Sequence, residues 1–371
     1  MSSFLIASWD GGGNTPSAFG LGARLARRGH RVRMLGWASM AARAAAAGIE
    51  FGVYPSVPPW PEGLVHEDGW DLMVECLWGP ACRADVVAEV EAFGADVLIL
   101  DGMLRAGFDA ARDLAVRTVT LVHVSYQQYL YEWGNEVMET DLGAMMAGCE
   151  VVLALQPPGF DVPCELPPGH EYVGAIGDGD VTRSVDAELA ARLGEPGDPW
   201  VLLSLSTTTQ RGQRETLQTV LDGLATMPVR VLVTLGSTME GSQLGLPANG
   251  VVRGFVQHEL VLPHMSAVVT HAGMSTIALS LAAGVPMVCV PQGRDQGGNA
   301  ERVAAIGAGL VAPAGEVADA VGVLLADGLY SATAERFARA CIPLGGGARA
   351  TDLVEALALS PATSLGTSGR R

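Results

Sequence analysis

The sequence predicts an α/β protein with two Rossmann-like β/α/β domains that face each other across a cleft. Short runs of β-branched and aliphatic residues alternate with helical segments, first from residue 4 to about residue 174 and again from residue 200. Such alternation is typical of parallel sheets covered by helices on both faces. The length of 371 residues exceeds one ordinary domain and suits two, each with its own core.

A change in polarity indicates the domain boundaries. Residues 177–198 are polar and rich in Gly, Asp and Pro, as expected of an interdomain linker, with one short helix. We therefore expect a first domain over residues 1–176 and a second over residues 199–345. The last helical stretch is expected at about residues 333–358, and the residues after Pro361 are expected to form a disordered tail.

Each strand is expected in a short apolar run that is followed by turn residues. The first run leads into a glycine-rich turn, and the helix after it has Pro16 in its first turn and Gly29 at its end. The segment between Pro55 and Pro80 interrupts the alternation and predicts a lid or binding loop. The expected strands are residues 4–8, 31–35, 50–54, 96–100, 118–122, 150–155 and 172–174 in the first domain, and 200–205, 229–235, 251–255, 268–270 and 285–290 in the second.

The opening β/α/β unit could be mistaken for a dinucleotide site. Gly11 and Gly13 lack a third glycine at the required spacing, and the second strand ends in Leu35-Gly36-Trp37 rather than in an acidic residue. The acid is needed to bind a ribose hydroxyl of NAD. NAD binding is therefore not expected, and no cofactor is predicted.

Composition excludes several partners. The net charge of −17 supplies no basic patch for nucleic acid or an anionic membrane. Six scattered cysteines without metal-binding spacing indicate reduced, structural thiols. No signal peptide and no run of about 18 apolar residues is present, so a cytoplasmic location is expected.

An anion site is predicted where the strand 268–270 ends. His271 follows it directly, and a helix begins within the next few residues and ends before Gly284. The free N–H groups and positive end of such a helix favour a phosphate. Gly273 lets the backbone approach the phosphate closely, while the hydroxyls of Ser275 and Thr276 can donate to it or cap the helix.

A hydroxyl-binding pair follows the next strand. Asp295 and Gln296 come after the run 285–290, and the carboxyl ends of neighbouring parallel strands converge on one crevice. Their acceptors and donors suit vicinal hydroxyls. An anion site beside such a pair describes a sugar nucleotide.

These residues resemble the donor-binding signature of the family 1 glycosyltransferases, especially the bacterial natural-product branch. The shared pattern is a His-x-Gly run with Ser and Thr, an Ala-Ala-Gly-Val-Pro turn, and a Pro-Gln-x-x-Asp-Gln-x-x-Asn-Ala run. The segment 253–258 is similar to the family's Gly-Phe-Val-Pro-His segment, with Gln257 in place of proline. The resemblance implies a GT-B fold, in which residues 346–371 would form a C-terminal helix that returns toward the first domain, followed by the tail. It also implies the donor-binding residues Ser206, Thr207, Val256, His271, Gly273, Ser275, Thr276, Asp295 and Gln296.

The resemblance also implies a reaction. A sugar, a thymidine-diphosphate-linked deoxysugar in this branch, would pass with inversion to a small apolar aglycone. Because Asn14 stands where the family has its base, an already acidic acceptor, such as a phenol or a polyketide, is expected. His271 and the helix N-terminus would stabilise the leaving diphosphate in place of a metal ion. Asn299 and Arg302 are expected to support the following helix rather than touch the donor.

The first domain departs from the family at the catalytic base. The family has a His or Asp in the turn after the first strand, but this turn contains Asn14, which cannot take a proton at neutral pH. Asp101 matches the acid that usually orients that His. Asp101, Asp10 or His123 could act as base, Asn14 could orient the acceptor, or Asp101 could merely cap the following helix.

Two aromatic segments predict the acceptor site. Trp60, Trp70 and Trp78 lie between residues 55 and 80, and a second segment, 123–133, is dense in aromatic and hydroxyl groups. Either segment could line a pocket for a flat acceptor, or the tryptophans could form a small core under the loop. The acceptor-binding residues expected are Trp60, Trp70, Trp78, His123, Tyr126 and Tyr129.

Two other functions fit the same architecture. One is a sugar-nucleotide epimerase, which needs no acceptor, and the other is a non-catalytic sugar-nucleotide-binding auxiliary protein, which the presence of Asn14 keeps open. The sequence leaves open the sugar, the nucleobase, the acceptor and the oligomeric state, a homodimer included.

Overall fold

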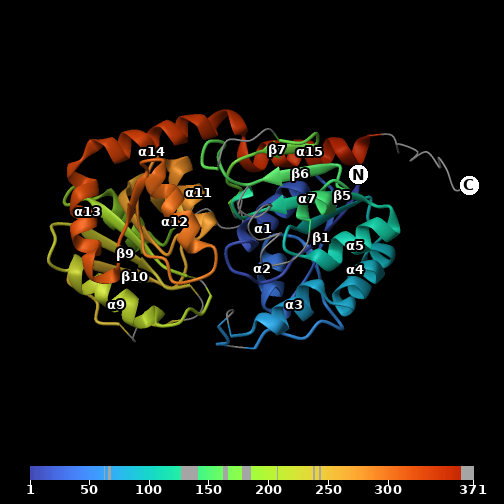
Figure 1. Ribbon diagram of the computed structural model, residues 1–371, viewed down its shortest axis with the longest axis horizontal. Coiled ribbons are helices and arrows are strands. Elements are labelled where there is room, and N and C mark those ends of the chain that lie inside the picture. The colour runs from blue at the N-terminus through green and yellow to red at the C-terminus, as the bar shows by residue number, and fades with distance from the viewer. Residues whose placement is uncertain are drawn as a thin grey trace, which may run out of the picture.

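The computed structural model describes residues 1–61, 63–65, 68–126, 141–161, 166–177, 185–206, 208–236, 239–241 and 244–360. It consists of two α/β lobes that lie side by side (Figure 1). Each lobe contains one sheet, and all strand pairings are parallel. The predicted α/β class with two parallel sheets is confirmed.

The first sheet has seven strands in the order β3-β2-β1-β4-β5-β6-β7. Alternate residues of its strands enter two cores on opposite faces, so Leu5 and Ala7 of β1 pack on one side while Phe4 and Ile6 pack on the other. Both faces are covered, which explains why these strands are continuously apolar. The strands are β1 (Ser3–Ala7), β2 (Arg31–Gly36), β3 (Glu50–Val53), β4 (Val97–Asp101), β5 (Arg117–Val122), β6 (Val151–Ala154) and β7 (His170–Tyr172).

The second sheet has six strands in the order β10-β9-β8-β11-β12-β13. Here the strand predicted at 285–290 is shorter, because the N–H of Val285 donates to the carbonyl of Ser280 and ends the preceding helix. The last strand of this sheet, at residues 309–311, was not predicted from the sequence. Its Gly309 lies so close to the neighbouring strand that a Cβ there would be 2.0 Å from the carbonyl oxygen of Met287. The strands are β8 (Trp200–Ser204), β9 (Arg230–Thr234), β10 (Gly250–Arg253), β11 (Met265–Thr270), β12 (Met287–Cys289) and β13 (Gly309–Val311).

Helices flank both sheets (Figure 1). The segment expected to be a loop between Pro55 and Pro80 contains a nine-residue helix, α3, so that expectation was wrong for residues 70–78. The helices of the first lobe are α1 (Thr15–Arg27), α2 (Ala41–Ala46), α3 (Trp70–Trp78), α4 (Pro80–Phe93), α5 (Arg105–Leu114) and α7 (Leu142–Met146). Those that follow are α8 (Ala187–Gly194), α9 (Gln213–Leu224), α10 (His258–Val261), α11 (Met274–Ala283), α12 (Gln296–Ala305), α13 (Val317–Ala326), α14 (Gly328–Cys341) and α15 (Gly346–Leu359).

The C-terminal helical stretch is broken in two. A 3₁₀ turn and Gly345, with φ of 75°, separate α14 on the second lobe from α15, which lies along the first (Figure 1). Ala350 and Val354 of α15 enter the first lobe's core, and Arg28 pairs with Asp352. The chain thus returns to the first lobe, while the expected disordered tail lies outside the described residues.

Two segments pack into the core of the second lobe. One is a helix of the predicted linker, and the other is a loop of the first lobe. Leu189 and Leu193 of α8 are buried in the second lobe's core, so this helix belongs to that lobe. Phe160, in the loop after β6, is buried in the same core. Arg302 of α12 donates to the carbonyl oxygens of residues 159, 160 and 161. This loop therefore connects the two lobes.

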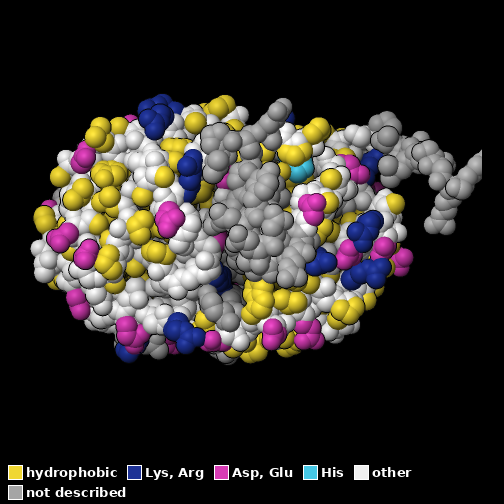
Figure 2. Space-filling view, in the orientation of Figure 1, with side chains coloured by type: hydrophobic (Ala, Val, Ile, Leu, Met, Phe, Trp, Pro, Cys, Tyr) yellow, Lys and Arg dark blue, Asp and Glu magenta, His cyan; other side chains and the backbone are white. Residues whose placement is uncertain are grey.

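No single helix in the described ranges is long and apolar enough to cross a membrane. One pair of helical segments, residues 314–326 and 328–359, together has the length and composition of a membrane span, but the pair is bent between them. On the face shown in Figure 2, Lys and Arg side chains are spread singly or beside Asp and Glu.

Candidate active site

A cavity of about 480 Å³ lies between the two lobes and is lined by residues from both. Its walls are loops at the carboxyl ends of β1, β5, β8, β11 and β12, which is where ligands bind in parallel α/β sheets. The second lobe contributes mainly polar loops. The first lobe contributes a glycine-rich turn and apolar side chains.

The N-terminus of α11 forms part of the second-lobe wall. His271, Gly273, Ser275 and Thr276 all line the cavity. The His271 ring lies directly against Gly273, because a Cβ built at Gly273 would be 2.6 Å from Nε2 of the ring. Ala272 between them has φ of 68°, a strained value for a residue with a side chain, as is common at functional sites.

His271 is a neutral imidazole at pH 7. Burial lowers its pKa to about 4, an effect opposed by the Ser204 backbone and reinforced by neighbouring His258. Burial also lowers the pKa of His258 to about 4. Each ring therefore keeps one N–H donor without carrying a charge.

Asp295 and Gln296 line the cavity beside α11. Asp295 accepts a 2.8 Å hydrogen bond from Asn299, which also donates to the Ala272 carbonyl at 3.1 Å, so Asn299 ties the two loops together. Gln296 is 2% exposed, and its side-chain oxygen accepts from the N–H of Gln292 at 2.7 Å. Gln296 thus holds the loop in which Asp295 lies.

The remaining predicted donor residues also lie at this wall where they are described. Ser206 and Val256 line the cavity, and Ser206 accepts a 3.1 Å hydrogen bond from the N–H of Thr208. Thr207 lies outside the described residues.

Sequence reasoning missed Arg294, which lines the cavity with φ of 56° and donates to Thr208 at 3.3 Å. Burial lowers the pKa of Arg294 to about 10, although the neighbouring Asp295 carboxylate acts to raise it. Arg294 therefore remains a cation at neutral pH. Its position next to Asp295 in the sequence was the available signal.

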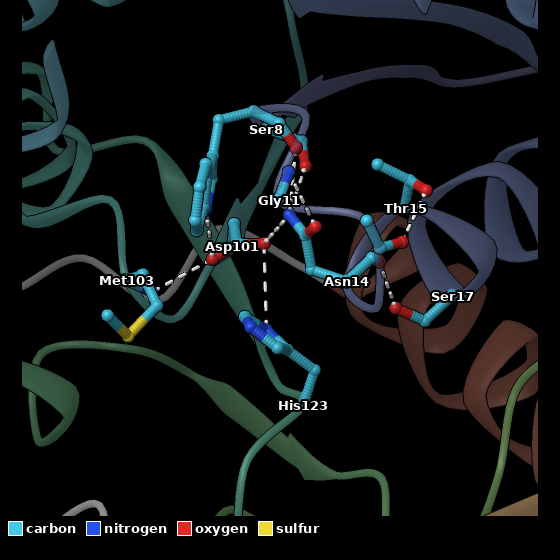
Figure 3. Close-up of polar contacts among 10 residues, drawn as sticks. Ser8, Gly11, Asn14, Thr15, Ser17, Asp101, Met103 and His123 are labelled. Atoms are coloured by element: carbon cyan, nitrogen blue, oxygen red, sulfur yellow. Dashed lines mark hydrogen bonds and ion pairs between the residues drawn. The ribbon is translucent and has the colours of Figure 1, made fainter. Parts of the chain in front are cut away.

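A buried polar cluster lies behind the first-lobe wall (Figure 3). Asp101, 4% exposed, accepts from Trp9 Nε1 at 3.2 Å and from the N–H of Met103 at 2.9 Å on one oxygen. Its other oxygen accepts from Asn14 Nδ2 at 2.7 Å and lies 3.6 Å from His123 Nδ1. Three segments far apart in the sequence, residues 9–14, 101–103 and 123, therefore meet at one carboxylate.

Two of the residues predicted as candidates for the base, Asp101 and Asp10, do not line the cavity. Asp101 is not among the described residues that line the cavity, because Asn14 and His123 lie there instead. Asp10 is not among them either and accepts a 2.7 Å hydrogen bond from Ser39. Neither carboxylate is placed to take a proton from an acceptor directly.

Asn14 lines the cavity but is held by its own turn. Both hydrogens of its Nδ2 have acceptors, the carbonyl of Trp9 at 2.9 Å and Asp101, and its Oδ1 accepts from the N–H of Gly11 at 3.1 Å. The amide thus has no free donor for an acceptor hydroxyl.

The predicted acceptor residues divide into two groups. Trp70 and His123 line the cavity. Trp60 and Trp78 do not lie among its lining residues: Trp60 stacks on Trp37 with 6.1 Å between ring centroids, and Trp78 donates to the Met103 carbonyl at 3.3 Å. Both pack on the first-lobe core, as in the alternative reading of this segment.

The prediction that Tyr126 contacts the acceptor was also wrong. It is 1% exposed, belongs to the same core, and its hydroxyl bonds to His170. Tyr129 lies outside the described residues. Sequence reasoning missed the apolar wall itself, which is made by Trp9, Met73, Met103 and Val124 together with Trp70.

Within the described ranges, no group of three or more His, Cys, Asp and Glu side chains is arranged to hold a metal ion.

Comparison with known proteins finds glycosyltransferases that are similar to this chain. Residues 218–343 match the family model of the erythromycin biosynthesis protein CIII-like C-terminal domain. A demethyllactenocin mycarosyltransferase of Streptomyces fradiae is 27% identical over 94% of this chain and 85% of the relative. A 4'-demethylrebeccamycin synthase of Lentzea aerocolonigenes is 31% identical over 41% of this chain and 36% of its own length.

Solved structures show the same fold. The calicheamicin glycosyltransferase CalG4 superimposes with a TM-score of 0.74 at 24% identity, over 96% of this chain and 98% of that one. SnogD from Streptomyces nogalater superimposes with a TM-score of 0.75 at 20% identity, over 96% and 99%. The fold is GT-B, and the protein is a glycosyltransferase. These similarities support the resemblance to the family 1 glycosyltransferases of the bacterial natural-product branch.

Proposed function

We propose that this glycosyltransferase moves a deoxysugar from a thymidine-diphosphate-linked donor to a small apolar aglycone, with inversion and without a metal ion. One observation carries the proposal. A single cavity has a polar wall at the N-terminus of α11 and, across it, an apolar wall from the first lobe. Such a cavity suits a donor with an anionic diphosphate and an acceptor that is largely hydrocarbon.

The donor wall suits stabilisation of a leaving diphosphate. The N–H groups that open α11 and the neutral His271 donate hydrogen bonds, and Arg294 adds a positive charge. Fixed donors and charges aimed at the developing negative charge lower the barrier to departure. These groups would take the part that a metal ion plays in other enzymes.

Asp295 and Gln296 would position the sugar. Asp295 keeps acceptor capacity beyond its bond from Asn299, and Gln296 holds the loop in place. A sugar hydrogen-bonded at this loop would present its anomeric carbon toward the opposite wall. Attack from that side, opposite the departing diphosphate, gives inversion.

The nucleobase and the acceptor are proposed from relatives. VinC was solved with dTDP and SsfS6 with thymidine diphosphate, and each shares the GT-B fold with this chain. The Streptomyces fradiae relative is a mycarosyltransferase. Trp9, Trp70 and Met103 offer a flat polyketide or phenol an apolar surface.

Calorimetric titration of dTDP, UDP and NAD into the wild type and His271→Ala tests the donor site. We expect dTDP to bind the wild type and to bind the variant at least tenfold more weakly, since the variant lacks a donor to a charged group. Binding of NAD alone, or equal dTDP affinity in both proteins, would refute the donor assignment.

A further inference from the structure

Proton removal from the acceptor needs a base at the cavity surface. The oxygen of a hydroxyl group attacks the anomeric carbon more readily when a positioned side chain takes its proton. The described residues of the first lobe that line the cavity include one titratable side chain, His123. The others are apolar residues, glycines, Pro16, Ser125 and the amide Asn14.

The contacts of His123 suit a base. Its side chain is 14% exposed, and it follows the end of β5. Nδ1 is buried and has no hydrogen-bond partner among the described residues; one oxygen of the Asp101 carboxylate lies 3.6 Å from it. A small rotation of the ring would bring this pair to hydrogen-bonding distance, and catalytic hydrogen bonds are often long until substrate binds.

The Asp101 carboxylate is prepared for that bond. One oxygen is occupied by the donors of Trp9 and Met103, while the other has only Asn14 and retains a free lone pair on the side of His123 (Figure 3). A ring that donates Nδ1–H to this lone pair carries its own lone pair on Nε2. The carboxylate would also stabilise the imidazolium that forms.

We infer that His123 is the general base of the transfer, oriented by Asp101, an inference that rests on the proposed function. Nε2 of His123 takes the proton of the acceptor hydroxyl as the oxygen bonds to the anomeric carbon. The bond from that carbon to the β-phosphate oxygen breaks at the same time, and the diphosphate leaves with the electron pair. The imidazolium then returns its proton to solvent.

Asn14 is a positioning residue in this arrangement. It does not accept the proton; its Nδ2 and Trp9 hold the Asp101 carboxylate at the angle that leaves one lone pair for His123. Its replacement should act through the base and leave donor binding unchanged.

The test compares acceptors of different acidity. Rates with a dTDP-linked deoxysugar are measured for the wild type, His123→Gln and Asp101→Asn, using a nitrophenol, an unsubstituted phenol and an aliphatic alcohol. A nitrophenol is largely ionised at neutral pH and needs little help. We expect His123→Gln to lose about 10²- to 10⁴-fold with phenol and alcohol but less than about tenfold with nitrophenol. Asp101→Asn should show the same pattern, more weakly.

Two controls separate the possible failures. Asp10→Asn, which removes a rival carboxylate away from the cavity, should keep wild-type rates. Calorimetry should give equal dTDP affinity for the wild type and His123→Gln, so a wild type that does not bind dTDP refutes the proposed function and not merely the base. In a His123→Ala variant whose dTDP affinity shows that it is folded, added imidazole should restore turnover.

Several results would overturn the inference. The first is a His123→Gln enzyme with wild-type rates on the weakly acidic acceptors. The second is an equal loss with all three acceptors. The third is a folded His123→Ala variant, with wild-type dTDP affinity, that imidazole does not rescue.

Discussion

Gly273→Ala should weaken donor binding without unfolding the protein. Gly273 has φ of −67° and ψ of 133°, which alanine adopts without strain, so the backbone need not move. The added Cβ, however, would lie 2.6 Å from Nε2 and 2.8 Å from Cε1 of His271. Ordinary contact between such atoms is about 3.5–4.0 Å, so the ring must move by about 1 Å.

The size of the effect follows from what the ring loses. If His271 donates to the diphosphate, a displacement of about 1 Å breaks a hydrogen bond to a charged group, worth about 1.5–3 kcal/mol. That corresponds to a rise of about 10- to 150-fold in the Kd for dTDP, since about 1.4 kcal/mol is tenfold. An altered rotamer costs the fold only about 0.5–1.5 kcal/mol.

Gly297→Ala is the matched control, because its Cβ has nothing within 4 Å in the first turn of α12, close to Asp295. Calorimetry with dTDP and thermal unfolding should be measured for both variants. The control should bind dTDP as the wild type does and be slightly more stable, as a helical Gly→Ala change usually is. Unchanged affinity in Gly273→Ala, or an equal loss in the control, would refute the proposed contact of His271 with the diphosphate.

Three further changes probe other parts of the structure. Phe160→Ala should lower the free energy of unfolding by about 3–5 kcal/mol, measured by denaturant titration, because this buried ring packs in the second lobe's core. Trp70→Ala should raise the KM for an apolar acceptor while the dTDP Kd stays constant, whereas Trp78→Ala should chiefly lower the melting temperature. The folded-state pKa of His258 and His271 is about 4, and about 6.5 is usual for the unfolded chain. The unfolded chain therefore binds more protons between these values, so stability should be full above about pH 6.5 and fall toward pH 4, less steeply in His258→Gln.

The donor wall could be predicted because its chemistry is local in the sequence. His271 to Thr276 follow one strand, and Asp295 and Gln296 follow the next, so the parallel-sheet rule was enough to bring them to one cavity. The role of Asn299 as a support was also within reach, since it lies one helical turn after Asp295.

The acceptor wall could not be predicted in the same way. An aromatic residue packs equally well into a core or a cavity, and the sequence does not say which side of α3 faces the cleft. Trp70 and Trp78 lie at the two ends of that nine-residue helix, edge to face with 5.9 Å between centroids, yet only Trp70 lines the cavity. Tyr126 was wrongly assigned to the acceptor site because its hydrogen-bond partner, His170, lies 44 residues further along the chain.

The position of Asp101 explains how Asn14 can be tolerated in an active enzyme. Strand β4 lies between β1 and β5 in the sheet, so a carboxylate at its end has the turn after β1 on one side and the residue after β5 on the other. In the family that this chain resembles, the partner of that acid is in the turn after the first strand. Here that place holds the amide of Asn14, which donates one hydrogen bond to the carboxylate, and the imidazole of His123 stands on the opposite side. The same acid can therefore orient a base from either neighbour, which allows the base to change strands while the carboxylate stays where it is.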